Sequence, residues 1–463
     1  MGSKQTNDLD EQTEKLNLFE NITLKPDKII AHHKERIYPN SDAALTSHNQ
    51  PMDFEVKNLS QHYIDLSSMR LEGSLKILKS GGGTLGDTDV VAFVNNIHSW
   101  IGRIEILVGG VLITDFTTDR YGYKAFIENL LSYNNMGMNH LSALSHWHMD
   151  DPDRYDAVLA KDEKSVGTAG SPSVVTKHAN TGFVKRYSKC KESKWVPFSI
   201  PLYSDVFQAD KIWPSNISFT VRINKAPVEF FLMAGKKTSG DFDSYKIEFR
   251  NVYLELNKLN IHPVLLRYNE QKLLKTNFRF HYDRVLITEH TLKQNQPHMQ
   301  IEIHAGVLPR YCISFFVRSS AANGQLDQNP YLFENLKMTE SYAKVNGVII
   351  DTFPLKTDYE NDDYLSAFKK MYDTMNIKRG NNQHFVTYEL FKNSANLQVY
   401  DLTPDASFGV SATEPSEGTI TYHYTFKNPG LEQSYMVFTY MVFHDFYEID
   451  AERRIVLSTG RPV

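Results

Sequence analysis

The chain has 463 residues, of which 41% are hydrophobic and 12% aromatic, and its formal net charge is −5. This length predicts two or three domains, and the hydrophobic content is sufficient for buried cores. The mildly acidic balance gives no sign of a specific nucleic-acid reader, and no polybasic tail for membrane contact is visible.

The sequence predicts neither a disulfide framework, nor a secretion signal, nor a membrane span. The two cysteines, Cys190 and Cys312, lie far apart, which favours assembly in a reducing compartment. Residues 1–21 are polar and charged and lack the apolar core of a signal peptide. No run of about 18 apolar residues occurs, so we expect no transmembrane helix.

The first 50 residues are predicted to form a partly flexible N-terminal arm. Residues 1–28 are too polar to form a core, but if this part is helical a small apolar strip results from Leu16, Leu18, Phe19 and Ile22. We expect this arm and the C-terminal tail to act between subunits. Residues 29–50 are expected to be extended. His32 and His33 then point to opposite sides, which argues against a shared metal ion.

Strands are predicted from residue 51 onward. Asp53–Lys57 and Ser68–Leu78 alternate apolar and polar residues, which is typical of half-buried strands. The glycine-rich stretch Ser80–Gly86 (SGGGTLG) is interpreted as a turn. Because it lacks the adjacent Lys and Ser or Thr of a phosphate-binding loop, we do not expect a phosphate site there.

A hairpin leading into a helix follows in the stretch Trp100–Tyr133. Two predicted strands, Ile104–Val108 and Val111–Phe116, flank a turn at Gly109-Gly110. Glycines accept the positive φ angles that a two-residue hairpin turn requires. The predicted helix after it has an apolar face made of Tyr123, Phe126, Leu130 and Leu131.

The same unit recurs near the other end of the chain. Ser341–Phe353 (SYAKVNGVIIDTF) contains a turn at Asn346-Gly347, and a helical pattern follows with Tyr364, Ala367, Phe368 and Tyr372. Gly110 and Gly347 are 237 residues apart (347 − 110), about the size of one β-domain. The chain is therefore interpreted as two tandem copies of one β-rich fold, with these glycines at equivalent turns.

Residues 134–193 are predicted to form a long polar loop at a subunit boundary or on the surface. The stretch contains possible metal ligands at His140, His146, His148, Asp150 and Asp151. Their spacing matches no specific metal motif such as HExxH, so a solvated or interface loop is favoured over a metal site.

Further strands are predicted on both sides of a linker helix. Trp195–Leu202 contains two prolines, which suit an edge strand or a bulge. Ile217–Asn224 alternates cleanly. Residues 262–276 form the predicted linker helix, with Pro263 suited to its first turn. The last long strand, Tyr435–Tyr447, is apolar on both faces, which indicates a central strand covered on both sides, or on one side by the chain and on the other by a neighbouring subunit.

Patterns typical of catalysis are missing from the sequence. It contains no GxSxG elbow, no P-loop, no GxGxxG after a strand and no CxxC pair. The paired acids Asp150-Asp151 and Asp362-Asp363 lie in polar stretches, where a solvated surface is expected. A basic tail with Arg453, Arg454 and Arg461 is interpreted as a solvated terminus. We therefore predict no enzyme and assign no catalytic, cofactor-binding or metal residues.

Together these elements predict an all-β chain of two tandem eight-stranded antiparallel jelly rolls with short helical insertions, a double jelly roll. The expected divisions are an arm over residues 1–50, a first jelly roll over 51–260, a linker helix over 261–276 and a second jelly roll over 277–463.

Three segments carry a resemblance to a known family: PMDFEVKNLSQHYIDLSSMRLEGSLKI, NNIHSWIGRIEILVGGVLITDF and YGYKAFIENLLSY. They resemble the major capsid proteins of Polinton (Maverick) elements and adintoviruses, and YKAFIENLLSY is the most specific piece. The resemblance covers the first half well and the second half more loosely. The chain lacks the long loop insertions of larger double jelly roll proteins, which suggests low towers on the outer surface.

The resemblance implies a structural subunit located in a virion. Its expected assembly is a homotrimer that forms a pseudo-hexagonal capsomer of an icosahedral capsid, with a penton or minor capsid protein as partner at the vertices. Six similar sandwiches around a three-fold axis approximate a hexagon, which suits closed tiling. The alternative is a carbohydrate-binding or carbohydrate-active β-sandwich protein, because jelly rolls host many functions. A secreted β-rich enzyme is disfavoured by the missing signal peptide.

Overall fold

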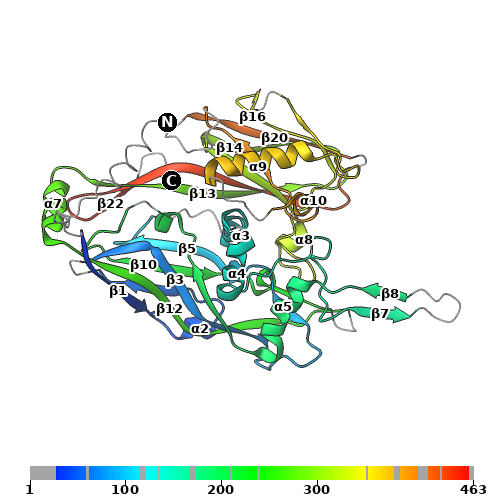
Figure 1. Ribbon diagram of the computed structural model, residues 1–463, viewed down its shortest axis with the longest axis horizontal. Coiled ribbons are helices and arrows are strands. Elements are labelled where there is room, and N and C mark those ends of the chain that lie inside the picture. The colour runs from blue at the N-terminus through cyan, green and yellow to red at the C-terminus, as the bar shows by residue number, and fades with distance from the viewer. Residues whose placement is uncertain are drawn as a thin grey trace, which may run out of the picture.

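The computed structural model of the protein contains two β-sandwiches, which lie one above the other in Figure 1. The residues that it describes are 28–58, 62–113, 120–133, 135–166, 174–208, 211–236, 240–350, 353–379, 386–404, 416–427 and 430–457. The predicted apolar strip between Leu16 and Ile22, and Arg461 in the tail, lie outside the described residues.

The first half of the chain forms two main sheets of four strands each, in the orders β1-β12-β3-β9 and β2-β10-β5-β6. All neighbouring strands are antiparallel. The first sheet consists of β1 (Ile29–Ile37), β12 (Tyr245–Ile261), β3 (His62–Lys79) and β9 (Val196–Pro201). The second consists of β2 (Met52–Val56), β10 (Phe219–Lys225), β5 (Ile101–Val108) and β6 (Val111–Leu112).

The second half repeats this plan in the orders β13-β21-β15-β19 and β14-β20-β16-β17. Two short strands extend these sheets, because β22 (Ile455–Leu457) pairs with β21 and β18 (Leu355–Lys356) pairs with β16. One sheet consists of β13 (Phe278–Leu292), β21 (Tyr435–Ile449), β15 (Tyr311–Arg318) and β19 (Gln398–Asp401). The other consists of β14 (His298–Val307), β20 (Glu417–Phe426), β16 (Met338–Val345) and β17 (Val348–Ile349).

The strand orders of the two halves are identical. When the eight main strands of each half are counted along the chain, one sheet has the order first, eighth, third, sixth and the other the order second, seventh, fourth, fifth. This is the arrangement of a jelly roll, in which the strands of successive hairpins are shared between two packed sheets. The predicted all-β double jelly roll is therefore confirmed.

Hydrophobic periodicity explains how the sheets build the core. In β10 the alternating residues Phe219, Val221 and Ile223 are 3%, 0% and 0% exposed, as their spacing predicts. In β21 the first nine residues are all buried. That strand pairs with β13 on one side and β15 on the other. The prediction of a central strand covered on both faces is therefore correct.

Two hairpin turns occupy the same place in the two jelly rolls. Gly109 and Gly110, with φ of 57° and 83°, join β5 to β6. Asn346 and Gly347, with φ of 50° and 82°, join β16 to β17. Positive φ at both central residues is the requirement of a tight hairpin turn whose twist matches the flanking strands. Both turns connect the fourth strand to the fifth, as predicted for Gly110 and Gly347.

The connection between the fifth and sixth strands carries helices in both halves. In the first half these are α3 (Tyr121–Ser132), α4 (Asn135–Leu144) and α5 (Thr181–Cys190). In the second half they are α9 (Leu365–Arg379) and α10 (Tyr388–Asn393). The first hairpin of the chain and α3 therefore form one unit, and the second hairpin and α9 form its counterpart.

The prediction of a long loop over residues 134–193 is wrong. The stretch contains α4, α5 and a hairpin of β7 (Glu163–Val166) and β8 (Val174–Lys177) that projects from the body of the molecule (Figure 1). Asn180 caps the N-terminus of helix α5, because its side chain accepts hydrogen bonds from the N–H groups of Gly182 and Phe183. Buried Phe183, Tyr187 and Cys190 lie at helical spacing on its inner face.

Strand β1 lies within the stretch expected to be an arm. It pairs with β12 along almost its whole length and forms an edge of the first sheet. Its side chains are mostly exposed, so no apolar alternation marks it in the sequence, and backbone hydrogen bonds define it instead. The first sheet therefore starts at Ile29 rather than after residue 50.

The linker between the two halves is helical, as predicted. Helix α7 (Pro263–Leu273) follows β12 and precedes β13, with Pro263 in its first turn. Among the described residues, no helix combines the length and apolar character needed to cross a membrane. The remaining short elements are α2 (Ala43–Thr46), β4 (Val91–Phe93), η1 (Ile97–Trp100), η2 (Lys191–Ser193), η3 (Asp205–Gln208), α6 (Val228–Phe231), β11 (Leu232–Ala234) and α8 (Ser319–Ala322).

Candidate assembly interface

Helix α3 lies between the two jelly rolls (Figure 1). Its residues are buried on all sides, including the polar Lys124 and Asn129. A helix on the surface of a single sandwich buries only one stripe. Burial of the whole circumference follows here because one face of α3 packs on its own jelly roll and the other on the second.

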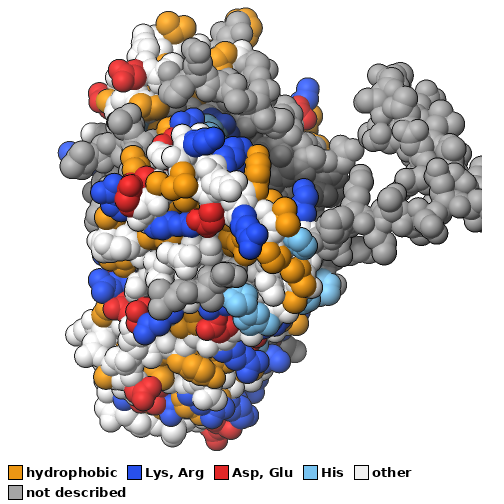
Figure 2. Space-filling model, turned by 90° about the vertical axis from the view of Figure 1, so that its left-hand side faces the viewer, with side chains coloured by type: hydrophobic (Ala, Val, Ile, Leu, Met, Phe, Trp, Pro, Cys, Tyr) orange, Lys and Arg blue, Asp and Glu red, His pale blue; other side chains and the backbone are white. Residues whose placement is uncertain are grey.

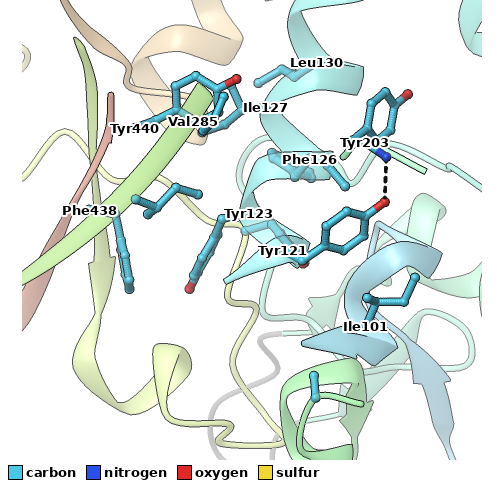
Figure 3. Close-up of a cluster of buried hydrophobic side chains, with 14 of the residues drawn as sticks. Ile101, Tyr121, Tyr123, Phe126, Ile127, Leu130, Tyr203, Val285, Phe438 and Tyr440 are labelled. Carbon is cyan, nitrogen blue, oxygen red and sulfur yellow. Dashed lines mark hydrogen bonds between the residues drawn. The ribbon is translucent and has the colours of Figure 1, made fainter. Parts of the chain in front are cut away.

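An aromatic cluster forms the apolar part of this contact. The ring of Tyr123 lies 4.6 Å from Phe438 of β21, 5.4 Å from Phe315 of β15 and 5.6 Å from Tyr331. Phe126 stacks on Tyr331 at 4.5 Å. Figure 3 shows Tyr123 and Phe438 facing each other across the junction, with Val285 and Tyr440 from the second half near Ile127 and Leu130. Aromatic pairs at these distances add specific geometry to the burial of apolar area.

Polar groups tie α3 to the second half around this cluster. Arg120 donates to Glu289 of β13 at 2.9 Å, and Tyr440 of β21 donates to Glu128 at 2.5 Å. The Tyr121 hydroxyl accepts from the backbone N–H of Tyr203 at 3.1 Å within the first half (Figure 3). Because these bonds surround an apolar contact, they fix the register of the helix on the sheet.

The carboxylate of Asp205 connects both halves. One oxygen pairs with Lys124 of α3, and the other accepts from the backbone N–H of Val285 in β13 at 3.0 Å. Burial raises the pKa of Asp205, and the adjacent Lys124 ammonium opposes this shift. Removing one partner of such a buried pair leaves the other uncompensated.

A second buried polar contact lies next to the aromatic cluster, since the Tyr331 N–H donates to Asn329 Oδ1 at 3.0 Å. Arg186 of α5 pairs with Asp150 at 2.8 Å, and both side chains are 0% exposed. Asn329 of the second half donates to Asp150 at 2.8 Å and to Asn95 at 2.7 Å. This network and the aromatic cluster of α3 together fix one jelly roll against the other.

The structure separates the residues that the sequence marked as possible metal ligands. His140 is exposed on α4, and the Nε2 atom of buried His146 lies 2.6 Å from the Pro197 carbonyl oxygen. Burial lowers the pKa of His148 to about 4. Asp150 pairs with Arg186, and Asp151 accepts from the Thr181 N–H at 2.9 Å at the start of α5. Within the described ranges no group of three or more such residues is arranged to hold a metal ion.

The other residues singled out from the sequence also have local partners. His32 and His33 are exposed on β1, and Asp362 pairs with Lys392. Cys190 and Cys312 are buried free thiols. Arg453 pairs with Glu270 of α7 at 2.5 Å, and Arg454 with Asp450 at 3.0 Å. Both arginines therefore have carboxylate partners within the chain, and contact of the C-terminal tail with a neighbouring subunit stays a prediction.

A cavity of about 600 Å³ opens between the two halves beside this junction. In its lining, Arg318 contacts Asp156 at 2.8 Å and Glu334 at 2.5 Å. The carbohydrate alternative requires aromatic faces open to a cleft. The tyrosines that line this cavity, Tyr155 and Tyr435, are only 2% and 7% exposed. They offer no stacking platform for a sugar ring.

Sequence reasoning missed the partners of α3. Tyr331, Phe315 and Phe438 belong to the second half of the chain, and no local pattern marked them as neighbours of this helix. One signal was available, because the segment YGYKAFIENLLSY is apolar on more than one face. A helix that is apolar around its circumference is buried on all sides.

Similarity to solved structures was found across nearly the whole chain. The protein is similar to a chain in the cryo-EM structure of the Sputnik virophage, with a TM-score of 0.56 and 10% identity over 96% of this chain and 91% of that chain. It is similar to the Faustovirus major capsid protein, with a TM-score of 0.54 and 9% identity over 93% and 92% of the two chains. The fold is a double jelly roll.

The chain is also similar to VP54 of PBCV-1, whose crystal structure was fitted into a reconstruction of Sputnik. The TM-score is 0.55, with 10% identity over 96% of this chain and 100% of that chain. No family model matches the sequence. An uncharacterized protein of Caenorhabditis elegans is 22% identical over 344 residues, which cover 72% of this chain and 74% of that protein. The three solved structures are 9–10% identical to this chain, so their similarity shows the fold alone.

Proposed function

We propose that this chain is a major capsid protein and acts as a structural subunit rather than an enzyme. The observation that carries the proposal is the repetition of one strand order in two jelly rolls that are fixed side by side through α3. Two similar sandwiches that are held rigidly in one relative orientation form a regular building block, and a closed shell is assembled from such blocks. The Faustovirus protein of the same fold is itself a major capsid protein.

The proposed assembly is a homotrimer. Three chains with two similar sandwiches each place six sandwiches around a three-fold axis and so approximate a hexagon. Hexagonal capsomers tile the faces of an icosahedral capsid, and the protein is then located in a virion. A penton or minor capsid protein occupies the vertices, because a hexagonal tile does not fit a five-fold axis.

The proposed origin is a Polinton (Maverick) element or an adintovirus. The support is the resemblance of the first half, above all YKAFIENLLSY, which forms the helix α3 at the junction of the jelly rolls. We propose no specific readout of nucleic acid and no membrane contact.

Size and shape of the purified protein test this function. Light scattering is expected to give about 160 kDa, three times the 53.2 kDa chain, and electron microscopy is expected to show hexagonal capsomers or closed shells. A protein that stays monomeric over a wide concentration range contradicts the proposal, and binding to a glycan array by that monomer supports the carbohydrate alternative.

A further inference from the structure

Helix α9 is the counterpart of α3 but is covered on one face only. Both helices follow the fifth strand and precede the sixth strand of their jelly roll. In α9 the inward residues Ala367 and Met371 are 3% and 1% exposed, whereas Leu365 is 63% and Tyr372 is 37% exposed. The second jelly roll of the chain covers the outer face of α3, and the described residues place no such cover over α9.

The open face of α9 is an apolar stripe. Leu365, Phe368 and Tyr372 lie at i, i+3 and i+7, which places them on one side of a helix. Phe368 is half-buried, and exposed Lys369 lies beside it on the same side. A stripe of this kind on an amphipathic helix is typical of a contact surface.

The contact that α3 makes indicates which surface fits α9. Helix α3 packs on the outer face of the second jelly roll, over the third strand β15 at Phe315 and the eighth strand β21 at Phe438. This is the outer face, because the neighbouring residue Phe316 points inward and meets Tyr424 of β20 at 5.1 Å. The equivalent place on the first jelly roll is therefore the outer face of its third and eighth strands, β3 and β12.

The outer face of β3 and β12 on the first jelly roll is hollowed. A cavity of about 440 Å³ opens there between the third, sixth and eighth strands. Glu72 of β3, Ser199 of β9 and Tyr253 of β12 line it, and Leu144 at the end of α4 stands at its rim with 44% exposure. Glu72 accepts hydrogen bonds from Ser199 at 2.9 Å and from Tyr253 at 2.7 Å, so the floor of the hollow is held in a fixed shape.

We propose that α9 of one chain docks into this hollow on the first jelly roll of the next chain. This inference rests on the proposed homotrimer and names its interface. Within a chain, α3 of the first jelly roll packs on the second jelly roll. The proposed contact of α9 with the next chain has the same form, so one type of contact joins all six jelly rolls and closes the ring. The chemistry matches: Leu365 and Tyr372 meet Leu144 and the ring of Tyr253, and Lys369 approaches the acidic Glu72.

A matched pair of double variants tests the docking. Leu365→Asp with Tyr372→Glu puts two carboxylates on the α9 stripe. The control, Leu274→Asp with Tyr268→Glu, changes the same residue types at or near α7, where Leu274 is 76% and Tyr268 is 58% exposed. Figure 2 shows that end of the molecule, where apolar side chains are scattered among charged and histidine side chains rather than gathered in a stripe. Sedimentation velocity is expected to show a mass near one chain for the α9 variant and three chains for the control.

The outcomes separate the interface from the function. If the wild type and both variants are trimers, the α9 interface is wrong while the capsid function stands. If the wild type is a monomer, the proposed function fails first. The circular dichroism spectrum of the α9 variant is expected to equal that of the control, because Leu365 and Tyr372 are exposed in the single chain. Its Tm is expected to be lower than that of the control, because association into a trimer stabilises the folded chain.

Cross-linking provides a second measurement that needs no disruptive change. Leu365→Cys and Leu144→Cys are made in separate chains, which are mixed under conditions that allow subunit exchange and treated with a flexible bismaleimide. The native thiols Cys190 and Cys312 are buried and do not compete. A covalent dimer is expected in the mixture and not in either variant alone. Its absence from a trimeric mixture overturns the proposed docking.

Discussion

The ring of Tyr123 lies 4.6 Å from the ring of Phe438, although the two residues belong to different jelly rolls and are more than 300 positions apart in the sequence. Tyr123 is 0% exposed and also contacts Phe315 and Tyr331. The junction of the two sandwiches is therefore packed like the interior of a domain rather than like a mobile domain contact.

Truncation of the Tyr123 side chain is expected to be strongly destabilising. Tyr123→Ala removes a ring that touches both halves, and large-to-small changes of this kind cost about 3–5 kcal/mol of unfolding free energy. The measurement is denaturant unfolding followed by circular dichroism. Tyr268→Ala on α7 is the control, since a 58% exposed ring contributes about 0.5 kcal/mol or less. Equal effects of the two changes contradict the central role of Tyr123.

The two equivalent turn glycines are expected to respond alike to substitution. Gly110 and Gly347 have φ of 83° and 82°, and a Cβ at either position meets no atom within 4 Å. Gly→Ala is therefore expected to lower the unfolding free energy only through the strain of a left-handed backbone, by about 1–2 kcal/mol at each site. Gly81→Ala is the control, because that glycine has open space and no positive φ. Thermal unfolding of the three variants gives the comparison, and a loss at Gly81 as large as at the turns refutes the explanation.

Local signals were enough for the turns and for the core strands. A glycine-containing dipeptide between two apolar runs specifies a hairpin because few other residues accept its φ angles. Strands such as β10 were predictable because alternation reports one buried face. The prolines of Val196–Pro201 indicated an edge strand, and β9 lies at the edge of its sheet.

Features that depend on long-range packing were not predictable in this way. Strand β1 has exposed side chains and is defined by its backbone pairing with β12, so its pattern resembles an arm. Lys124 is buried in α3 because Asp205 and the second jelly roll cover it, and neither is near it in the sequence. In α5 the spacing of Phe183, Tyr187 and Cys190 did carry a helical signal, but the polar residues between them concealed it.

Acidification is expected to destabilise the protein through His98. Complete burial, with a smaller contribution from the nearby Arg70 charge, lowers the pKa of His98 from 6.5 to about 3. The unfolded chain therefore takes up a proton below pH 6.5 that the folded chain accepts only near pH 3. Stability is lost as the pH falls through this window, by about 2 kcal/mol at pH 5.

The variant His98→Gln is expected to remove this part of the pH dependence. Denaturant unfolding at pH 7.5 and pH 5.0 is compared for the variant and the wild type, and the difference between the two pH values is expected to shrink by about 2 kcal/mol. His32→Gln on exposed β1 serves as the control and is expected to leave the difference unchanged. An unchanged difference in the His98 variant contradicts this assignment.

Removal of the N-terminal arm is expected to impair shell assembly without unfolding the trimer. The deletion covers residues 1–27 and keeps Lys28, because the Lys28 carbonyl accepts a hydrogen bond from the His262 N–H at 3.0 Å. Ordering a polar segment costs about 1–2 kcal/mol of conformational entropy per residue. We therefore expect the arm to become ordered only where its apolar residues are buried against a neighbouring capsomer. Tm and trimer mass are therefore expected to be unchanged, while electron microscopy shows few closed shells.

A matched pair of arm variants identifies the responsible residues. Changing Leu16, Phe19 and Ile22 to Ser keeps the length of the arm but removes the predicted apolar strip, and it is expected to reproduce the deletion. Changing Thr13, Asn17 and Asn21 to Ser alters the same number of uncharged residues and is expected to leave assembly intact, since these side chains lie on the opposite side of the helix from the strip. Two results refute the prediction. If the protein without residues 1–27 no longer forms a trimer, the arm belongs to the folded core. If it assembles normal shells, the arm is dispensable.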